Sequence, residues 1–537
     1  MKKRFLAILL TVVMVLALAV PAAAYTVNET KLDSTWHYDT YVNHAGGGLK
    51  LVKTTHNGLF GYVNYQDIPV VQAKYTALAG FSEGVAVAVK DGAYVYVDTT
   101  GKEVITLGVA KEAYNFSCGL ARVISTSGIT YFIDHTGKSV FTCGANTAED
   151  FVQVANGVAL ARVTTPDGRI GLVNTQGVEI AHYWYTELRP FSEGLAYFRS
   201  VNGYQGFLNT NGVEVFRVDN KLNVGVDVEV GGAHGDFSDG MVIVENTTAP
   251  LNSRIGYLDK TGYQAVHCRF EEGDDFFGGV ARIKSAGKWG YVAKNNEYTV
   301  QPEYDLLDRY TGASVNALMR AGKIFRDTVA GPSTVGVDSN DHLVMTPSTV
   351  TTDPYMHYGF VNVLNTNSMV DDVRVPLVYT NARPFAGDNL AYVEKWSAKG
   401  FVNTNGVLVV NDGGYYDQMG NSSEGKAWVV KNGKWGYIAT TQGGRLTIPM
   451  VFDVDGVMGY PNLGGYCNFS NGVAVACFGN VHADTGAGAD TGRYGIIDAA
   501  GNWLTANWYD WIDSIIYADR MALAQYGGGN KIRFVFY

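Results

Sequence analysis

The sequence has little cysteine, little proline and little charge. Among 537 residues there are 5 cysteines and 13 prolines, and charged residues make up 17%, against a usual share of about 25%. So few cysteines exclude a small fold held together by disulfides. An acidic disordered polymer is excluded as well, because 47% of the residues are hydrophobic, which is ample for a core.

Positive charge is also in short supply. The chain contains 41 Lys and Arg against 51 Asp and Glu, a net charge of −10. Nucleic-acid binding depends on neutralising phosphates, and adhesion to anionic lipid needs the same sign of charge, so neither partner is expected. An acidic chain suits neutral or cationic partners, and the acidity also favours solubility.

Only one hydrophobic run is long, and it lies at the start of the chain. Three basic residues at 2–4 precede an apolar segment at 5–20, and small residues follow at 21–24. This pattern predicts a secretory signal peptide at residues 1–24. The alternative is an uncleaved anchor, for which the run is short. After cleavage we expect no membrane span and a secreted or cell-surface-associated protein.

The cysteines leave several disulfide pairings open. They are Cys118, Cys143, Cys268, Cys467 and Cys477. Cys467 and Cys477 flank a strand-like segment and could join neighbouring strands. Cys118 and Cys143 are the other plausible pair, which leaves Cys268. Sequence alone does not settle the connectivity.

Catalytic and metal-binding motifs are scarce. There is no zinc-type histidine spacing, no Gly-x-Ser-x-Gly elbow and no phosphate loop. Two Asp-Thr-Gly triplets lie six residues apart in one glycine-rich loop, residues 482–492, whereas aspartic proteases take them from separate lobes. The acidic run 271–275 is interpreted as a solvated loop before a Phe at 277. We therefore predict no catalytic residue, no metal and no cofactor.

A glycine-aromatic-aliphatic motif recurs along the chain. Asn432–Ile438 nearly repeats Ala286–Val292. Looser copies begin at Gly61, Gly171, Gly206, Gly256, Gly400 and Gly495. Self-similarity at a regular spacing sets the architecture, and it predicts one small β unit copied about a dozen times.

A second element, Phe-Ser-Glu-Gly, precedes alternating apolar residues, as at Phe81–Gly84 and Phe191–Gly194. Period-2 alternation after a turn predicts a half-buried strand. A Tyr lies six residues before the Phe, for example at Tyr75 and Tyr185, and so belongs to the unit. Successive Phe positions, taken as 81, 116, 151, 191, 237 and 277, are 35 to 46 residues apart. That spacing predicts three to four short strands per unit.

The central strand ends in a fixed turn, with Asp or Asn first and Gly three residues later. Examples are Asp98–Gly101, Asn174–Gly177 and Asp259–Gly262. The first side chain can hydrogen-bond the backbone ahead of it, and Gly accepts a positive φ, which predicts a type I turn closing a hairpin. A row of calcium ligands is the less favoured interpretation, because Asp and Asn exchange freely here.

Together these motifs resemble the bacterial WG-repeat family, whose units carry Gly-x-Trp-Gly-Tyr-Ile-Asp, Pro-x-Tyr-Asp and Phe-Ser-Glu-Gly elements. The resemblance covers nearly all of residues 48–537, although only two copies keep the tryptophan. The clearest structural motif residues are Trp289, Gly290, Tyr291, Trp435, Gly436, Tyr437, Phe81, Gly84, Phe191 and Gly194. The resemblance implies secreted or surface-associated β repeats with a binding role, and it transfers no catalytic residue.

We predict an all-β fold of tandem antiparallel β-meanders, 35–47 residues each. The repeats are expected to be propeller-like, in one or two rings, with an open β superhelix as the alternative. The predicted organisation is a signal peptide at 1–24, a lead-in at 25–47, a first array at 48–305, a degenerate repeat or insert at 306–356 and a second array at 357–537.

Candidate binding residues are aromatic. They are Trp184 and Tyr185 in one cluster and Trp508, Tyr509 and Trp511 in another. Such rings stack on sugars or anchor protein interfaces, although packing between units is the alternative. The sequence favours a non-catalytic extracellular scaffold for a glycan or protein. An exported polysaccharide-acting enzyme and a structural spacer are the other hypotheses.

Overall fold

The computed structural model describes much of the chain. The described residues are 36–37, 49–54, 58–64, 69–218, 228–229, 235–246, 254–312, 317–326, 328–330, 334–337, 343–346, 349–351, 354–365, 370–441, 443–453, 467–477, 494–505, 511–512, 521–525 and 532–536. No α-helix occurs in these ranges, and so none that could cross a membrane. The predicted signal peptide lies outside them.

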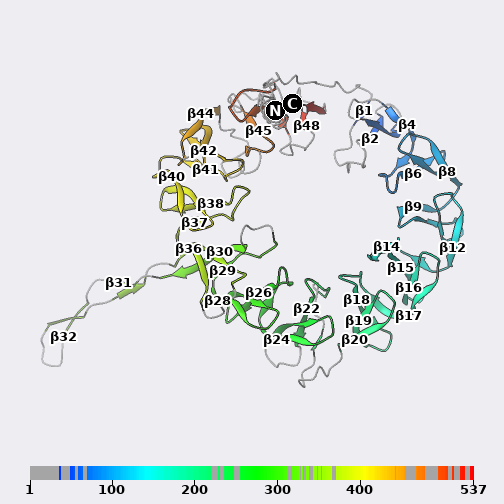
Figure 1. Cartoon of the computed structure of the whole chain (residues 1–537), viewed down its shortest axis with the longest axis horizontal. Coiled ribbons are helices and arrows are strands. Elements are labelled where there is room, and N and C mark those ends of the chain that lie inside the picture. The colour runs from blue at the N-terminus through cyan, green and yellow to red at the C-terminus, as the bar shows by residue number, and fades with distance from the viewer. Residues whose placement is uncertain are drawn as a thin grey trace, which may run out of the picture. The chain divides into compact units, whose positions relative to one another are not determined.

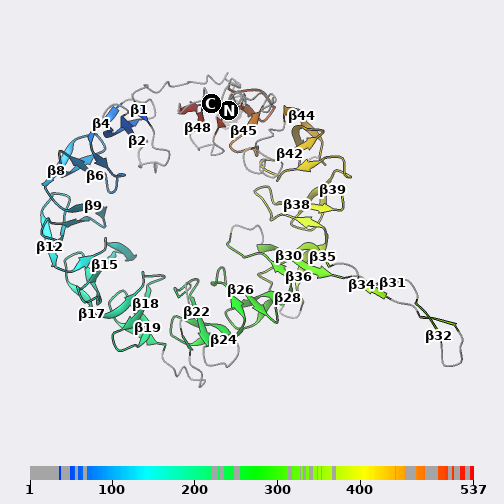
Figure 2. The same ribbon diagram turned by 180° about the vertical axis from the view of Figure 1, so that it is seen from behind.

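The strands form successive sheets along the chain (Figures 1 and 2). The first three are β1 (Trp36–His37), β2 (Leu49–Thr54), β3 (Phe60–Asn64), β4 (Pro69–Tyr75); β5 (Ala77–Leu78), β6 (Val85–Lys90), β7 (Ala93–Asp98), β8 (Glu103–Gly108); and β9 (Glu112–Ser117), β10 (Leu120–Ile124), β11 (Thr130–Ile133), β12 (Ser139–Gly144). An eight-stranded sheet follows: β13 (Thr147–Ala148), β14 (Val152–Ala155), β15 (Val158–Thr164), β16 (Ile170–Asn174), β17 (Glu179–Leu188), β18 (Leu195–Ser200), β19 (Gln205–Asn209), β20 (Glu214–Arg217).

The next four sheets are β21 (Val228–Glu229), β22 (Met241–Asn246), β23 (Arg254–Asp259), β24 (Gln264–Phe270); β25 (Glu272–Gly273), β26 (Val280–Ser285), β27 (Lys288–Ala293), β28 (Tyr298–Tyr304); β29 (Leu306–Leu307), β30 (Leu318–Phe325), β35 (Tyr355–Asn362), β36 (Asp372–Tyr379); and β37 (Asn381–Ala382), β38 (Leu390–Lys395), β39 (Ala398–Asn403), β40 (Leu408–Asn411). The last are β41 (Gln418–Met419), β42 (Lys426–Lys431), β43 (Lys434–Ala439), β44 (Leu446–Asp453); β45 (Val473–Cys477), β46 (Tyr494–Asp498); and β47 (Trp511–Ile512), β48 (Met521–Gln525), β49 (Ile532–Phe536).

Most sheets are four-stranded antiparallel meanders, which confirms the predicted all-β repeat class. An inner sheet such as β5–β8 packs against a neighbouring sheet on each of its two faces. In the sheet β5–β8, Ala86 and Ala88 pack into one core cluster with Tyr62 of the preceding sheet. Val85 and Val87 face the other way, into a cluster with residues of the following sheet. Successive side chains of β6 therefore point alternately into two different cores. Because both faces of the strand are buried, the side chains on both faces are apolar.

In most repeats the motif position requires glycine because the backbone of the neighbouring fourth strand approaches it closely. The fourth strand bulges opposite the central strand, as where Tyr291 pairs with Val300 and Trp289 with Tyr304. A Cβ on Gly290 would lie 2.6 Å from the Val300 carbonyl oxygen. The same clash, at 2.3–2.6 Å, would occur at Gly61, Gly206, Gly256, Gly359 and Gly436. At these six positions only glycine fits against the bulge; Val95 and Tyr131 hold the same place in two repeats whose fourth strand pairs in a different register.

The Asp-x-x-Gly turn forms as predicted. The Asp98 carboxylate accepts hydrogen bonds from the backbone N–H groups of Thr100 (2.9 Å) and Lys102 (3.0 Å). Gly101 has φ = 87° and donates its N–H to the Asp98 carbonyl oxygen. Among the described residues, no group of three or more His, Cys, Asp or Glu is arranged to hold a metal.

Residues 306–356, predicted to hold a degenerate repeat or an insert, belong to a four-stranded sheet that contains an insertion. β30 and β35 pair over eight residues as the central hairpin of an ordinary sheet. The chain between them carries two further paired segments, β31 with β34 (Thr328–Ala330 and Thr349–Thr351) and β32 with β33 (Thr334–Val337 and Leu343–Thr346). The sequence looks degenerate because an insertion extends one hairpin.

The contacts group the chain into two compact units, 33–409 and 410–537 together with 1–32. The first unit contains the sheets from β1 to β39, and the candidate site lies within it. The second has its own core, which includes Trp435, Tyr437 and Phe469. β40 crosses the division between them.

Candidate functional site

The contacts between successive sheets, here called junctions, repeat as closely as the sheets themselves. We name each junction after the residue at the second position of the motif, which follows glycine in most repeats and follows Val95 and Tyr131 in two of them. At seven junctions this residue is aromatic, and its ring packs on the Phe of the next repeat with centroids 4.8–5.1 Å apart. The pairs are Tyr62–Phe81, Tyr96–Phe116, Phe132–Phe151, Phe207–Phe237, Tyr257–Phe276, Phe360–Phe385 and Tyr437–Phe469.

Where the motif residue is tyrosine, its hydroxyl also reaches the next repeat. It donates a hydrogen bond to the carbonyl oxygen two residues before the Phe position. The bonds are Tyr62 to Ala79 (2.8 Å), Tyr96 to Tyr114 (2.6 Å), Tyr257 to Asp274 (2.8 Å), Tyr291 to Asp308 (2.6 Å) and Tyr437 to Cys467 (2.6 Å). Burial raises the pKa of Tyr62 to about 12, so this hydroxyl keeps its proton and remains a donor.

The Phe-Ser-Glu-Gly turn supplies two more links between repeats. Its serine hydroxyl donates to the carbonyl oxygen of the next Phe, as from Ser238 to Phe276 (2.8 Å). Its acidic side chain accepts the N–H of the next turn's glycine, as Glu193 does from Gly240 (2.8 Å). The serine bond recurs at Ser82, Ser117, Ser192 and Ser423, and the carboxylate bond at Glu83, Asp239 and Glu424.

The backbone of this turn explains its sequence. Glu83 has φ = 51° and Gly84 has φ = 83°, and Glu193 and Gly194 repeat this at 49° and 85°. Two successive positive φ values define a type I′ turn, whose twist suits a two-residue hairpin. The structure also corrects one position: Phe276, not Phe277, is the buried residue, while Phe277 takes the place of the serine.

The junction at Leu172 departs from this pattern. Leu172 occupies the place of the motif tyrosine, opposite Ala181, where Tyr257 faces Val266 and Tyr291 faces Val300. The preceding turn is altered too, because Val152 stands where Ser117 and Ser192 stand in the adjacent repeats. There β14 and β15 pair from Val152–Leu160 as far as Ala155–Val158, so the hairpin extends further before its turn.

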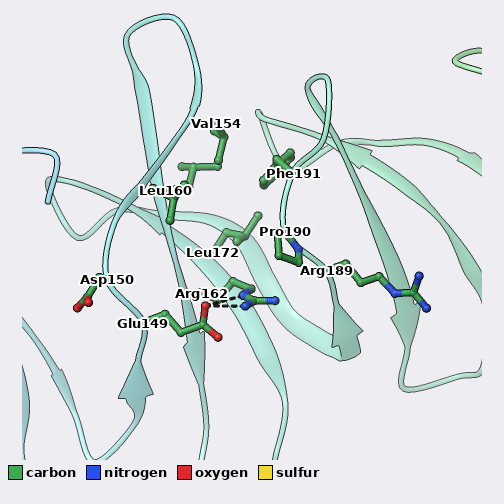
Figure 3. A pocket seen from close by; sticks show the side chains of 10 residues that line it. Glu149, Asp150, Val154, Leu160, Arg162, Leu172, Arg189, Pro190 and Phe191 are labelled. Atoms are coloured by element: carbon green, nitrogen blue, oxygen red, sulfur yellow. Dashed lines mark hydrogen bonds and ion pairs between the residues drawn. The ribbon is translucent and has the colours of Figure 1, made fainter. Parts of the chain in front are cut away.

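An open pocket lies at the Leu172 junction, with about 470 Å3 of empty space including its mouth (Figure 3). Its apolar wall is formed by Val154, Leu160, Leu172, Pro190 and Phe191. Leu172 is 2% exposed and forms the floor, while Val152 at the mouth is 61% exposed. The pocket is therefore a deep apolar recess between two repeats.

Charged side chains surround the apolar part. Arg162 makes an ion pair with Glu149 (2.6 Å) and donates to the Leu188 carbonyl oxygen (2.6 Å). Asp150 pairs with Arg122 (2.8 Å), and in Figure 3 it points away from the apolar residues. A regular junction has the same arrangement, since Arg282 bonds both Asp274 (2.7 Å) and the Leu307 carbonyl oxygen (2.7 Å). The charges are thus ordinary repeat contacts, and the unusual feature is the missing ring.

Comparison with known families agrees with this geometry. The model of the WG containing repeat matches the sequence five times, at residues 60–94, 96–124, 170–204, 255–289 and 400–435. The chain is a WG-repeat protein. Each of the five matched segments runs from a central strand into the next repeat, and the match at 170–204 spans the Leu172 junction.

Several solved structures share a low level of similarity with this WG-repeat chain. BamB from Moraxella catarrhalis is 15% identical over 55% of this chain and 95% of its own, with a TM-score of 0.25. The computationally designed Ika8 protein is 14% identical over 54% and 94%, with a TM-score of 0.24. Hsv2p from Kluyveromyces lactis is 10% identical over 57% and 94%, with a TM-score of 0.21. Similarity at this level carries no functional argument. No curated protein matches the sequence.

The two tryptophans of the WG motif have packing roles. Trp435 is 1% exposed and its ring lies 4.8 Å from that of Phe452. Trp289 is partly exposed, with the Arg282 guanidinium 4.3 Å from its ring centroid. The tyrosines that follow, Tyr291 and Tyr437, are both buried. Phe81 and Phe191 are half-buried against the cores of their junctions.

The predicted aromatic cluster on β17 is divided between two faces. Trp184 is 59% exposed, with the His182 ring 5.1 Å away, and it remains a candidate surface contact. Tyr185 is 5% exposed and belongs to the core, so it cannot stack on a surface ligand. Trp508 and Tyr509 lie outside the described residues, and of Trp511 only its place in β47 is described.

The other residues singled out from the sequence have structural places. In the acidic run 271–275, Glu272 lies in the two-residue strand β25 and pairs with Lys284 (2.7 Å), while Glu271, Asp274 and Asp275 lie outside strands and both glutamates are exposed. Cys118 and Cys143, the suggested disulfide pair, are both free thiols, as is Cys268. Burial raises the pKa of Cys143 to about 11, which makes it a poor nucleophile. The Asp-Thr-Gly triplets lie outside the described residues.

The pocket itself was not anticipated from the sequence. Gly171-Leu172-Val173-Asn174 fits the motif as another copy, and a leucine at its second position does not by itself predict a recess. Two coincident departures mark the site: an aliphatic residue after the motif glycine, and the loss of the serine from the turn one repeat earlier.

Proposed function

We propose that this WG-repeat protein is a non-catalytic scaffold that binds a protein or glycan partner. The observation that carries the proposal is the pocket at the Leu172 junction. There the repeat contacts leave an apolar recess that the scaffold does not fill, whereas tyrosine or phenylalanine fills the same place at the seven junctions described above. Apolar recesses with a few polar groups at the rim are the usual form of binding sites.

The arrangement of carboxylates supports binding over hydrolysis. A glycosidase needs two carboxyl groups that face one substrate bond. At the pocket, Glu149 and Asp150 are each held by a different arginine, Arg162 and Arg122. The turn carboxylates of the other repeats are likewise engaged by backbone N–H groups, as Glu193 is by Gly240.

The partner is proposed to lie outside the cytoplasm. The signal-peptide pattern at residues 1–24 is the support for this part of the proposal. Trp184 offers a second place for contact, because an exposed indole can stack on a sugar face or anchor a protein.

The test is a binding survey with the exported full chain. We expect capture of a surface protein or a glycan in a pull-down and on a glycan array, and no release of sugar from polysaccharide substrates. Capture that weakens with Val152→Asp at the pocket mouth but not with Val178→Asp, at another exposed valine, would link binding to the pocket. Turnover of a polysaccharide would contradict the proposal. Absence of all binding would favour the spacer hypothesis.

A further inference from the structure

We propose that the pocket at the Leu172 junction accepts a tyrosine side chain presented by a protein partner. This inference rests on the proposed binding function and specifies its ligand. The structure supplies the template for that ligand, because the chain places its own aromatic rings in the equivalent position at seven other junctions.

The equivalence follows from strand register. Leu172 pairs with Ala181, and the flanking Ile170 pairs with Tyr185 across the bulge. At the Tyr257 junction, Tyr257 pairs with Val266 and Ile255 with Phe270. The side chain at 172 is therefore directed as Tyr257 is, but it is shorter and faces a smaller neighbour. The space that a phenol ring takes at Tyr257 is left empty here.

Both contacts of the missing ring have counterparts at the pocket. Phe191 holds the position of Phe276, on which the Tyr257 ring packs edge to face at 4.8 Å. The tyrosine hydroxyls elsewhere donate to the carbonyl two residues before that Phe, which at this junction is the carbonyl of Arg189. A carbonyl oxygen has two lone pairs and can accept a further donor. A tyrosine ring entering the pocket would therefore complete a contact pattern that the fold already uses.

The surroundings favour a protein as the source of the ring. Glu149 and Arg162 place both signs of charge beside the apolar recess, which suits the mixed charges and peptide groups that flank a protein tyrosine. A sugar would need an exposed flat ring to stack on, whereas Phe191 is half-buried between aliphatic side chains. The elongated β14–β15 hairpin adds Val152 and Val154 as an apolar edge for the partner backbone.

The test uses the full chain and short blocked peptides that differ at one central residue. We expect a tyrosine peptide to bind in calorimetry or by NMR shift changes. Its phenylalanine version should bind about tenfold more weakly for want of one hydrogen bond, and its leucine version should not bind detectably. Equal binding of all three would overturn the proposal.

Two variants place the binding at this junction. Leu172→Tyr should fill the recess from within and abolish peptide binding. Because a buried change can unfold the protein, Val152→Asp at the exposed mouth provides a second variant, with Val178→Asp as its control. Tyr257→Leu should create a similar recess at a regular junction and add a second site for p-cresol, since an emptied apolar cavity can take an aromatic molecule. Peptide binding unchanged by both Leu172→Tyr and Val152→Asp would overturn the proposal.

The outcomes separate this inference from the proposed function. If the chain captures a surface partner but the tyrosine peptide does not bind, the inference fails and the proposed function stands. If p-cresol binds but the peptide does not, the pocket is a site for small phenols and the protein source is wrong. If neither the peptide nor any surface partner binds, both proposals fail.

Discussion

The Tyr257 junction and the Leu172 junction are built on the same backbone and differ in what fills them. At the first, a buried phenol packs on Phe276 and donates to the Asp274 carbonyl oxygen. At the second, a leucine leaves a recess beside Phe191. The comparison teaches that the ring stabilises the junction but is not necessary for the fold, because the sheets still stack at the Leu172 junction, which lacks the ring.

The two junctions differ in one feature of the backbone and share the arginine contact. The strand β17 runs unbroken through the Leu172 junction and joins the flanking repeats into one eight-stranded sheet, whereas Glu271 separates β24 from β25 at the Tyr257 junction. Backbone hydrogen bonds continue across the Tyr257 junction as well, since the Glu271 N–H donates to the Lys284 carbonyl oxygen. Arg162 reaches the Leu188 carbonyl oxygen just as Arg282 reaches that of Leu307.

The largest effect is expected from emptying a regular junction. Tyr257→Leu removes a fully buried ring and its hydrogen bond, and it should lower the free energy of unfolding by about 3 kcal/mol. The measurement is urea unfolding followed by fluorescence. Tyr263→Leu, at a 69% exposed tyrosine, is the control and should change it by less than about 0.5 kcal/mol. A similar loss in both variants would mean that the ring does not hold the junction.

A slightly smaller effect is expected at the glycine behind the ring. Gly290→Ala puts a Cβ 2.6 Å from the Val300 carbonyl oxygen and should cost about 2 kcal/mol through backbone displacement. Gly80→Ala is the matched control, because a Cβ there meets nothing within 4 Å. The two are compared by thermal unfolding. Equal stability of the two variants would refute the close-approach explanation for the motif glycine.

Removing one serine hydrogen bond between repeats should lower the free energy of unfolding by a smaller amount. Ser238→Ala deletes the hydroxyl that bonds the Phe276 carbonyl oxygen and should lower stability by about 1 kcal/mol. Ser127→Ala, in an exposed turn, removes a hydroxyl that bonds only within the turn and should be nearly neutral. Hydrogen exchange of the β22–β26 amides is the readout. Unchanged protection in Ser238→Ala would show that this bond does not couple the repeats.

The smallest effect is expected from a surface carboxylate. Hydrogen bonds from Lys74, together with Lys90, lower the pKa of Glu103 from its usual 4.5 to about 2. Because the folded pKa is depressed, its contribution is present above about pH 4.5 and is lost as the pH falls towards 2. Glu103→Gln should lower stability at pH 7 by less than about 1 kcal/mol, since the partners are exposed.

That variant should also flatten the acid limb of the stability curve between pH 4.5 and 2. Unfolding measured at several pH values checks this, with Glu112→Gln as a control at a carboxylate on the next sheet. An unchanged pH profile would show that the lysines do not stabilise the folded state through Glu103.

The sequence was sufficient for the strands and turns within one repeat. Period-2 alternation predicted the strands, and the Asp98–Gly101 pattern predicted its turn, because both depend on neighbours a few residues away. The links between repeats could not be predicted, because the partner of Ser238 lies 38 residues further along the chain. Nothing in Phe-Ser-Glu-Gly alone shows that its serine and glutamate face outward to another sheet.

The pocket and the strand pairing across residues 306–356 could not be predicted, for different physical reasons. A leucine in an apolar strand is unremarkable until the ring it replaces is seen at the other junctions. Residues 306–356 looked like the end of an array because strand pairing between β30 and β35 spans an insertion that carries no motif. The sequence also does not distinguish a closed propeller from an open superhelix. That choice depends on a small rotation per repeat, which motif spacing does not encode.

The insertion between β30 and β35 has a use for protein engineering. Nearly thirty residues separate the paired strands at Phe325 and Tyr355, yet their register continues without a bulge up to that pair. The entropic cost of closing a hairpin loop grows only slowly with the length of the loop, so a long insertion is tolerated. The equivalent turns of other repeats, such as that between β26 and β27, are therefore suitable points at which to graft a loop, a tag or a small domain.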